Sequence, residues 1–174
     1  MKQFLIVVDM QKDFVDGALG TSEEQAIVPA AARKIRDFDG HIFVTFDTHS
    51  EGYLDTAEGR KLPVPHCVRG TPGWALDACI AAALAGKDWS AVEKPSFGST
   101  ALPQLLADAA GGEPFSVTLI GLCTDICVVS NALLIKAFFP EAPIAADSAC
   151  CAGVTPEKHE AALETMRSCQ IDVV

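Results

Sequence analysis

The stretch SVTLIGLCTDICVVS, residues 116–130, decides the fold. Its apolar run Ser116–Ile120 leads through a polar turn into a helical pattern at Asp125–Phe139. Continuous apolar runs of this kind, such as FLIVV at residues 4–8, are typical of parallel strands that are buried on both faces. A strand, a short turn and a helix in this order form the repeating unit of an α/β fold.

The same alternation recurs along the chain. Strands are predicted at Phe4–Val8, His41–Phe46, Trp89–Glu93, Ser116–Ile120, Pro143–Ala146 and Ile171–Val174. Helices are predicted at Glu23–Asp37, Gly73–Ala85, Thr100–Ala109, Asp125–Phe139 and Pro156–Ser168. Thr71 and Thr155 each precede a proline and are predicted N-caps of the helices that follow them. We expect one domain over residues 1–174, built on an open, mostly parallel sheet.

The composition limits the classes of partner. Of the 174 residues 49% are hydrophobic and 21% charged, which is typical of a folded globular protein. A net charge of −10 argues against nucleic acid and anionic membranes as partners. No apolar run reaches transmembrane or signal-peptide length, so a cytoplasmic location is expected. Seven cysteines, an odd number, favour reduced thiols over a disulfide framework.

Polar residues follow five of the predicted strands. In a doubly wound sheet, ligands bind beyond the carboxyl ends of the strands, so these residues should share one rim. They are Asp9, Asp47, His49, Lys94, Cys123, Thr124, Asp125, Cys127, Asp147 and Ser148. An acid, a base and a thiol on one rim predict a catalytic site.

The pair Cys123 and Cys127 has three interpretations: a metal clip, a redox pair, or one catalytic thiol beside a bystander. A clip needs two further ligands, and redox pairs are more often spaced as C-x2-C. Cys127 lies in the first turn of a predicted helix, where the N-terminal partial charge favours thiolate. Lys94 would lower its pKa further, and Asp9 would exchange protons. Four other thiols are interpreted as small buried hydrophobes: Cys79, Cys150, Cys151 and Cys169.

One long segment, Asp47–Thr71, fits neither a strand nor a helix. A loop of this length in a compact domain is usually functional or disordered. Its prolines and its two histidines favour a functional loop.

Four motifs in order carry a resemblance to a known family: IVVDMQKDF, DTH…PVPHC, EKPSFGS and GLCTDICV. They resemble motifs of the isochorismatase-like cysteine hydrolases, the superfamily that contains the nicotinamidases. The resemblance covers nearly the whole chain. It implies a Rossmann-like three-layer sandwich, in which a six-stranded, mainly parallel sheet carries helices on both faces.

The resemblance also implies the roles of the rim residues. The family's catalytic triad falls on Asp9, Lys94 and Cys127. A cis peptide is implied between Leu122 and Cys123, in a turn that aims the backbone N–H groups of Cys123 and Cys127 at a developing oxyanion. The Cys123 side chain would then be incidental.

A divalent metal ion, with zinc as the first choice, is a further implication of the resemblance. Nicotinamidases bind it through a pattern that falls here on Asp47, His49 and His66. One carboxylate and two imidazoles with open positions suit such a site. The fourth protein ligand varies in the family, and Asp55 and Glu58 are both candidates. The remaining histidines are interpreted as a strand-edge and a helix-surface residue: His41 and His159.

Two departures from the nicotinamidase pattern concern the substrate pocket. Pro63 stands where an aromatic residue usually precedes the second metal histidine, and the loop after Lys94 is shortened. Phe14 is retained as a pocket wall. Trp74 and Tyr53 are further candidates for an aromatic wall, or packing residues.

These features predict a nicotinamidase-like cysteine amidohydrolase that cleaves a small amide through a thioester. An N-carbamoyl or ureido amidohydrolase is the alternative within the family. Isochorismate is disfavoured, because its ether cleavage does not need the cysteine that is present. A non-catalytic binding or thiol-sensing module is the alternative from another class. We also expect a homo-oligomer.

Overall fold

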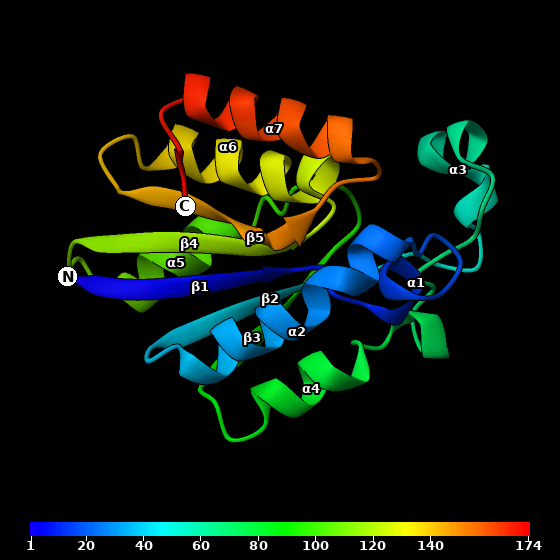
Figure 1. The fold of residues 1–174 in the computed structure, drawn as a ribbon, viewed down its shortest axis with the longest axis horizontal. Helices are drawn as coiled ribbons and strands as arrows, with labels where there is room; N and C mark the ends of the chain where they lie inside the picture. The colour runs from blue at the N-terminus through cyan, green and yellow to red at the C-terminus, as the bar shows by residue number, and fades with distance from the viewer.

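The computed structural model describes residues 1–174 and contains a six-stranded sheet with helices on both faces (Figure 1). The strands are β1 Lys2–Val8, β2 His41–Asp47, β3 Trp89–Lys94, β4 Phe115–Leu122, β5 Ile144–Ala152 and β6 Asp172–Val173. Their order is β3-β2-β1-β4-β5-β6, and every neighbouring pair is parallel. The predicted fold class is therefore confirmed.

Seven α-helices connect or flank the strands. They are α1 Lys12–Val15, α2 Ser22–Asp37, α3 Ala57–Lys61, α4 Ala78–Leu84, α5 Leu102–Ala110, α6 Val129–Phe138 and α7 Pro156–Ser168. Short 3-10 turns lie at Tyr53–Asp55 and Pro72–Trp74, and a π-helical turn at Thr124–Val128 leads into α6. None of the helices combines the length and apolar character that crossing a membrane requires.

The core has two layers, one on each face of the sheet. In β1, Phe4, Ile6 and Val8 pack with α5, α6 and α7, whereas Leu5 and Val7 pack with α2 and α4. Successive side chains of a strand point to opposite faces, so a strand covered on both sides must be apolar throughout. This is why the continuous apolar run predicted the buried central strand correctly.

Gly121 allows β4 to approach β1 closely near the carboxyl ends of the strands. Its φ is 119°, and a Cβ added there would collide with the backbone carbonyl of Val8. The register between β4 and β5 shifts next to it, between Leu119 and Gly121. A residue without a side chain is therefore required one position before the strand ends.

The predicted helix Gly73–Ala85 is shorter than expected. It begins at Ala78, and Asp77 caps it by accepting the N–H groups of Cys79 and Ile80. Thr71 instead stands at the N-cap of the short 3-10 turn Pro72–Trp74, and its hydroxyl makes no capping bond but donates to the Val68 carbonyl.

Backbone pairing explains the late start of α4. The Lys12 N–H donates to the Ala75 carbonyl at 2.8 Å, and the Asp77 N–H donates to the Met10 carbonyl at 2.9 Å. These bonds hold residues 75–77 in extended conformation beside the segment that follows β1. The other predicted cap is confirmed, since Thr155 accepts the N–H of Lys158.

Asp147 and Ser148 do not lie at the rim, so this part of the prediction is wrong. Strand β5 continues past both residues to Ala152. Asp147 forms an ion pair with Lys34 at 2.9 Å, and Ser148 donates through its N–H and hydroxyl to Val174. These partners let polar residues remain inside the strand.

The long loop 47–71 is partly ordered into helix, contrary to expectation. It contains the 3-10 turn Tyr53–Asp55 and helix α3, which the Thr56 side chain caps through the Gly59 N–H. Figure 1 shows α3 beyond the sheet, at the end of the molecule opposite the N-terminus.

Candidate active site and metal group

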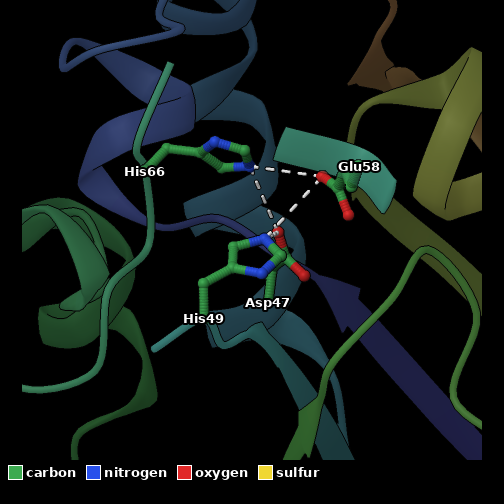
Figure 2. A group of neighbouring side chains, drawn as sticks. All are labelled: Asp47, His49, Glu58 and His66. Atoms are coloured by element: carbon green, nitrogen blue, oxygen red, sulfur yellow. Dashed lines mark hydrogen bonds and ion pairs between the residues drawn. The ribbon is translucent and has the colours of Figure 1, made fainter. Parts of the chain in front are cut away.

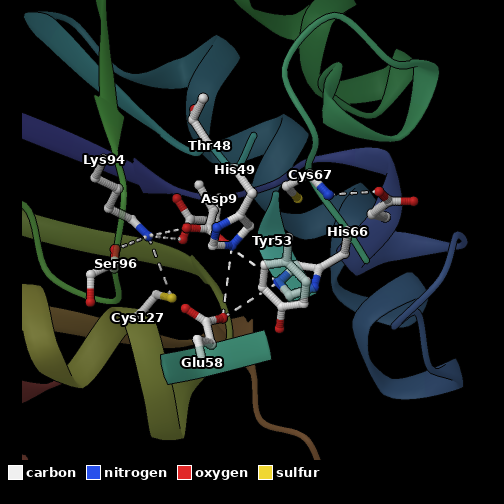
Figure 3. Close-up of polar contacts among 12 residues, drawn as sticks. Asp9, Thr48, His49, Tyr53, Glu58, His66, Cys67, Lys94, Ser96 and Cys127 are labelled. Atoms are coloured by element: carbon white, nitrogen blue, oxygen red, sulfur yellow. Dashed lines mark hydrogen bonds and ion pairs between the residues drawn. The ribbon is translucent and has the colours of Figure 1, made fainter. Parts of the chain in front are cut away.

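The sheet brings Asp9, Lys94 and Cys127 together at the carboxyl ends of its strands, as predicted (Figure 3). The Lys94 Nζ lies 2.6 Å from Asp9 Oδ2 and 3.6 Å from Cys127 Sγ. It also donates to the Ser96 carbonyl at 2.9 Å. All three members are at most 4% exposed. The lysine thus connects the acid and the thiol in a buried site.

Asp9 is held in place by a residue that the sequence analysis missed. The Thr45 hydroxyl donates to Asp9 Oδ1 at 2.6 Å, and the Asp9 N–H reaches the same hydroxyl at 3.2 Å. Asp9 has φ of 47°, in the left-handed region that non-glycine residues rarely adopt. Such backbone strain is found at functional sites, where surrounding contacts hold it.

The turn that carries Cys127 is π-helical rather than the first turn of a regular α-helix. The Cys123 carbonyl accepts N–H groups from Ile126 and Val128, and the implied cis peptide between Leu122 and Cys123 is present. The Cys123 N–H has no hydrogen-bond partner within the chain. The turn therefore leaves a backbone donor available beside the thiol.

Two side chains brace this turn. The Asn131 Nδ2 donates to the Cys127 carbonyl at 2.8 Å, while its Oδ1 accepts the Ser99 N–H at 2.9 Å. His159 Nδ1 lies 2.8 Å from the Thr124 hydroxyl, so this histidine supports the turn rather than facing only solvent. Asn131 lies inside a predicted helix, and nothing in the sequence pattern of that helix indicates that it supports the turn.

The predicted lowering of the Cys127 pKa is wrong. Burial raises the pKa of this thiol well above its ordinary value, the Asp9 carboxylate adds to the rise, and Lys94 opposes it. A single ammonium, shared with Asp9 and Asp47, does not replace the lost water. The resting site therefore holds a neutral thiol beside an ion pair.

The ion pair itself has shifted acidities. Burial raises the pKa of Asp9, and the neighbouring Lys94 ammonium offsets part of that rise. Burial opposes the charge of Lys94, but the Asp9 carboxylate and the other nearby acids outweigh it and raise the pKa of the lysine. Lys94 stays protonated, and Asp9 is a stronger base than an exposed aspartate.

A second group of side chains stands beside the triad: Asp47, His49, Glu58 and His66 (Figure 2). One potential ligand atom from each lies within 4.8 Å of the others. Asp47 Oδ2 is 2.9 Å from His49 Nε2 and 3.5 Å from His66 Nε2. Glu58 Oε1 is 3.8 Å and 3.7 Å from the same two nitrogens. The structure brings Glu58 into the group, whereas Asp55 is exposed and outside it.

Backbone pairing brings the two histidines together. The His49 N–H donates to the Cys67 carbonyl, and the Arg69 N–H donates to the His49 carbonyl, both at 2.9 Å. The His66 Nδ1 lies 2.8 Å from the Val64 carbonyl, which can only accept, so Nδ1 carries the proton. The Nε2 atom therefore faces the group, and it must give up its proton before it can act as a metal ligand.

Gln11, which the sequence analysis also missed, fixes the backbone of Asp47. Its Oε1 accepts the Asp47 N–H at 2.8 Å, and its Nε2 donates to the Asp47 carbonyl at 2.9 Å. Gln11 is fully buried and reaches across from the segment after β1. A glutamine in IVVDMQKDF is typical of a solvated turn, so the sequence does not indicate that Gln11 holds the backbone of Asp47.

The charges and the spacing fit a divalent cation. Asp9, Asp47 and Glu58 bring three carboxyl groups near one lysine. Burial alone would raise the pKa of Asp47, but hydrogen bonds from His49 and His66 outweigh it and hold that pKa well below its usual range. Ligands about 2.1 Å from a tetrahedral zinc stand about 3.4 Å apart. The distances from Asp47 and Glu58 to the two histidine nitrogens, 2.9 to 3.8 Å, lie on both sides of that value.

Tyr53 and Trp74 do not wall the pocket. The Tyr53 ring packs edge-on against His49 and His66, with centroids 4.7 Å and 5.0 Å away, and its hydroxyl donates to the Leu62 carbonyl. The Trp74 indole donates to the hydroxyl of Thr48. Both aromatic residues therefore support the loop.

The triad thiol and three members of the metal group, Asp47, Glu58 and His66, line one cavity of about 260 Å³. Its lining residues are Phe14, Leu19, Glu24, Asp47, Glu58, Leu62, His66, Phe97, Cys123, Ile126, Cys127 and Val154. Phe14 is a pocket wall, as expected, and Phe97 is one that the sequence analysis missed, although it lies in the EKPSFGS motif. A wider hollow of about 670 Å³, which His49 lines, adjoins the cavity through Glu58, Leu62, Phe97 and Ile126.

Two expectations about the thiols can be compared with the structure. All seven cysteines are free in this structure. Cys150 and Cys151 are buried as expected, but Cys79 and Cys169 are exposed. The latter two lie near the ends of amphipathic helices, where a short side chain gives little indication of which way it faces.

A buried thiol, lysine and carboxylate lie together at the carboxyl edge of a parallel α/β sheet, an arrangement that fits a hydrolase with a Rossmann-like fold. The family model described as isochorismatase domain matches residues 3–174, so the chain belongs to the isochorismatase family.

Individual relatives place the chain on the nicotinamidase-like side of the family. It is 33% identical over 147 residues to the isochorismatase family protein PncA of Bacillus subtilis, covering 76% of this chain and 78% of the relative. It is 29% identical to the nicotinamidase/pyrazinamidase of Mycobacterium tuberculosis, covering 98% of this chain and 97% of the relative. Its fold is similar to that of pyrazinamidase from Pyrococcus horikoshii in complex with zinc, with a TM-score of 0.80, 28% identity, and 100% and 99% of the two chains covered.

Proposed function

We propose that the protein hydrolyses the C–N bond of a small, flat primary amide, as nicotinamidases do, through a thioester on Cys127. One observation carries the proposal: the Cys127 thiol, buried with Asp9 and Lys94, lines the same cavity of about 260 Å³ as three members of the metal group. That cavity is smaller than the pockets of drug-sized ligands, which start at roughly 300 Å³. Phe14 and Phe97 among its walls suit a planar substrate.

The first step forms the thioester. Asp9 takes the thiol proton as Cys127 Sγ attacks the amide carbonyl carbon. The carbonyl oxygen becomes an oxyanion, which accepts hydrogen bonds from the backbone N–H groups of Cys123 and Cys127. Each such donor is typically worth about 3 kcal/mol in the transition state. The C–N bond then breaks, Asp9 returns the proton to the leaving nitrogen, and ammonia departs.

The second step reverses these proton movements. Asp9 deprotonates a water molecule, which attacks the thioester carbon. The carbon–sulfur bond then breaks and the acid is released. Asp9 returns its proton to the thiolate, which regenerates the thiol. Lys94 remains an ammonium throughout, where it holds Asp9 and stabilises the transient thiolate. The raised pKa of Asp9 supports its work as a base.

Asp47, His49, Glu58 and His66 would hold a divalent metal ion, for which we propose zinc. When bound, the ion supplies a Lewis-acidic point that orients the substrate through a ring nitrogen. The protein residues around it do the remaining positioning: Phe14 contacts His66 at a ring distance of 5.4 Å, and Phe97 lies among the other walls.

A thiol-sensing role is disfavoured by the same site. Sensor cysteines have a low pKa and are accessible to solvent. Cys127 is 4% exposed, and burial raises the pKa of its thiol.

Ammonia release from a panel of amides tests the proposal. The panel holds nicotinamide, an N-carbamoyl amino acid and a ureido acid, and the protein is purified without a histidine tag. We expect nicotinamide to be hydrolysed, about one equivalent of divalent metal by elemental analysis, and loss of activity on chelation. A metal-free protein that hydrolyses only the carbamoyl or ureido compounds, unchanged in chelator, would contradict the proposal.

A further inference from the structure

Glu24 is the one charged residue of the cavity wall that belongs to neither the triad nor the metal group. It lies in the first turn of α2 and is 1% exposed. The mechanism proposed above gives it no task. A carboxyl group buried against a reaction pocket without a task is a candidate for contact with the substrate.

The structural role of Glu24 occupies one of its two oxygens. Oε2 accepts the Thr21 N–H at 2.7 Å, which completes a capping box with the Thr21 hydroxyl. Oε1 lies 3.2 Å from the Sγ of Cys123, another residue of the cavity wall, and a thiol is a weak donor. Oε1 therefore retains most of its capacity to accept a hydrogen bond.

No positive charge compensates this carboxyl group. Glu24 forms no ion pair, and burial raises its pKa while Asp125 adds a like charge. A buried carboxylate without a counter-charge is costly, and a donor carried by a ligand would reduce that cost. A capping box works equally well with glutamine at this position, so helix capping alone does not require the charge.

The location of Glu24 indicates which part of a substrate it meets. Cys123, whose side chain it contacts, supplies one of the proposed oxyanion donors. Glu24 therefore stands next to the reacting carboxamide. A substituent on the ring atom beside the carboxamide would lie closest to it.

We propose that Glu24 is a specificity-determining residue: it accepts an N–H from an amino group beside the carboxamide and so favours amino-substituted planar amides. This inference rests on the proposed amidohydrolase function. A methyl group is about the same size as the amino group but has no N–H to donate. The Glu24 carboxylate would repel an anionic substituent in the same place. A site built to hydrogen-bond a substrate rejects an analogue that lacks the partner group.

The test compares substrates that differ in one donor. Ammonia release gives kcat/KM for nicotinamides that carry either an amino or a methyl group beside the carboxamide. For the wild-type protein we expect the amino compound of at least one ring position to be favoured about ten- to hundredfold, the range of a hydrogen bond to a charged group. In Glu24→Gln we expect that ratio to fall to about one or below. The glutamine oxygen would hold the Thr21 N–H, which leaves its NH₂ donor facing the cavity.

Glu23→Gln is the matched control. Glu23 lies in the same turn of α2 but is exposed and outside the cavity, so this variant should keep the wild-type ratio. Equal kcat/KM for the amino and methyl compounds in the wild type would overturn the inference without any variant, as would an unchanged ratio in Glu24→Gln. If the amino compound, the methyl compound and nicotinamide all release ammonia at similar rates, the proposed role of Glu24 is wrong but the proposed amidohydrolase function stands. If no amide releases ammonia, the proposed function fails and the inference falls with it.

Discussion

The triad and the metal group stand side by side but are built in different ways. Asp9 directly follows β1, Lys94 ends β3, and Cys127 lies in the turn after β4; all three are almost fully buried. The metal group takes Asp47 from the end of β2 but its other members from the loop 48–66, and the Glu58 side chain is 19% exposed. The sheet fixes the positions of the triad atoms, whereas the metal group depends on a loop that a few hydrogen bonds hold in place. Chemistry should therefore tolerate change less than substrate positioning does.

The largest expected effect comes from the sheet-borne thiol. Cys127→Ala should lower kcat by at least about 10⁴-fold, because the nucleophile is lost while the cavity remains. Cys123→Ala should cost only a few-fold, since its backbone N–H stays in place. Initial rates of ammonia release, with circular dichroism as the check on folding, measure both. Equal losses in the two variants would show that the thiol roles are assigned wrongly.

The loop-borne group should respond less steeply and in a different parameter. Glu58→Gln should weaken metal binding by at least about tenfold and raise KM more than it lowers kcat, because the metal positions the substrate. Asp55→Asn is the matched control, since Asp55 is exposed in the same loop and outside the group. Metal titration and steady-state kinetics of both variants provide the measurement. A Glu58→Gln variant that keeps its metal and its KM would remove this residue from the site.

The thiols should also differ in their reactivity with iodoacetamide. Because burial raises the pKa of Cys127, its thiolate fraction at pH 7 is below that of an ordinary cysteine. The exposed Cys79 and Cys169 should be labelled first, at least about tenfold faster than Cys127. Mass spectrometry after brief labelling of the unliganded protein reads the order. Preferential labelling of Cys127 at neutral pH would mean that Lys94 outweighs burial.

Alkaline pH should lower the free energy of unfolding by a smaller amount, through buried thiols in both the loop and the sheet. Burial raises the pKa of Cys67 in the loop, and likewise raises the pKa of Cys151 in β5 to about 12. The unfolded chain loses these protons near pH 8.5, so stability is complete below that pH and falls as pH rises toward the folded pKa. At one pH unit above 8.5 each thiol should cost about 1.4 kcal/mol.

Urea unfolding from pH 8 to pH 10 measures this loss. Cys67→Ala and Cys151→Ala should each flatten the decline in unfolding free energy, whereas Cys169→Ala, at an exposed thiol, should not. A wild-type unfolding free energy that is constant over this range would contradict the assigned pKa directions.

The difference between the two regions also explains what the sequence predicts well. Apolar runs such as residues 4–8 define the strands, and the ends of parallel strands meet at one edge, so the positions of Asp9, Lys94 and Cys127 along the chain are enough to group them. Asp47 and His49 follow from the same rule. Glu58 could not be distinguished from Asp55, because the fold of the loop depends on distant partners such as Cys67.

The remaining misses have the same physical origin. Thr45, Gln11 and Asn131 act through long-range hydrogen bonds that leave no local pattern. The pKa of Cys127 was predicted in the wrong direction because the helix start was visible in the sequence while the depth of burial was not. Asp147 was misplaced because strand β5 continues through polar residues whose partners lie on α2 and at the C-terminus.

The account depends most directly on covalent attachment to Cys127, which rapid acid quench during the first turnover of nicotinamide can detect. Tandem mass spectrometry of the peptide that holds both Cys123 and Cys127 locates any acyl group between the two thiols. We predict a nicotinoyl adduct on Cys127 alone, which disappears as the acid product forms. Ammonia release with the adduct on Cys123, or with Cys127 unmodified throughout the first turnover, would contradict the proposed mechanism.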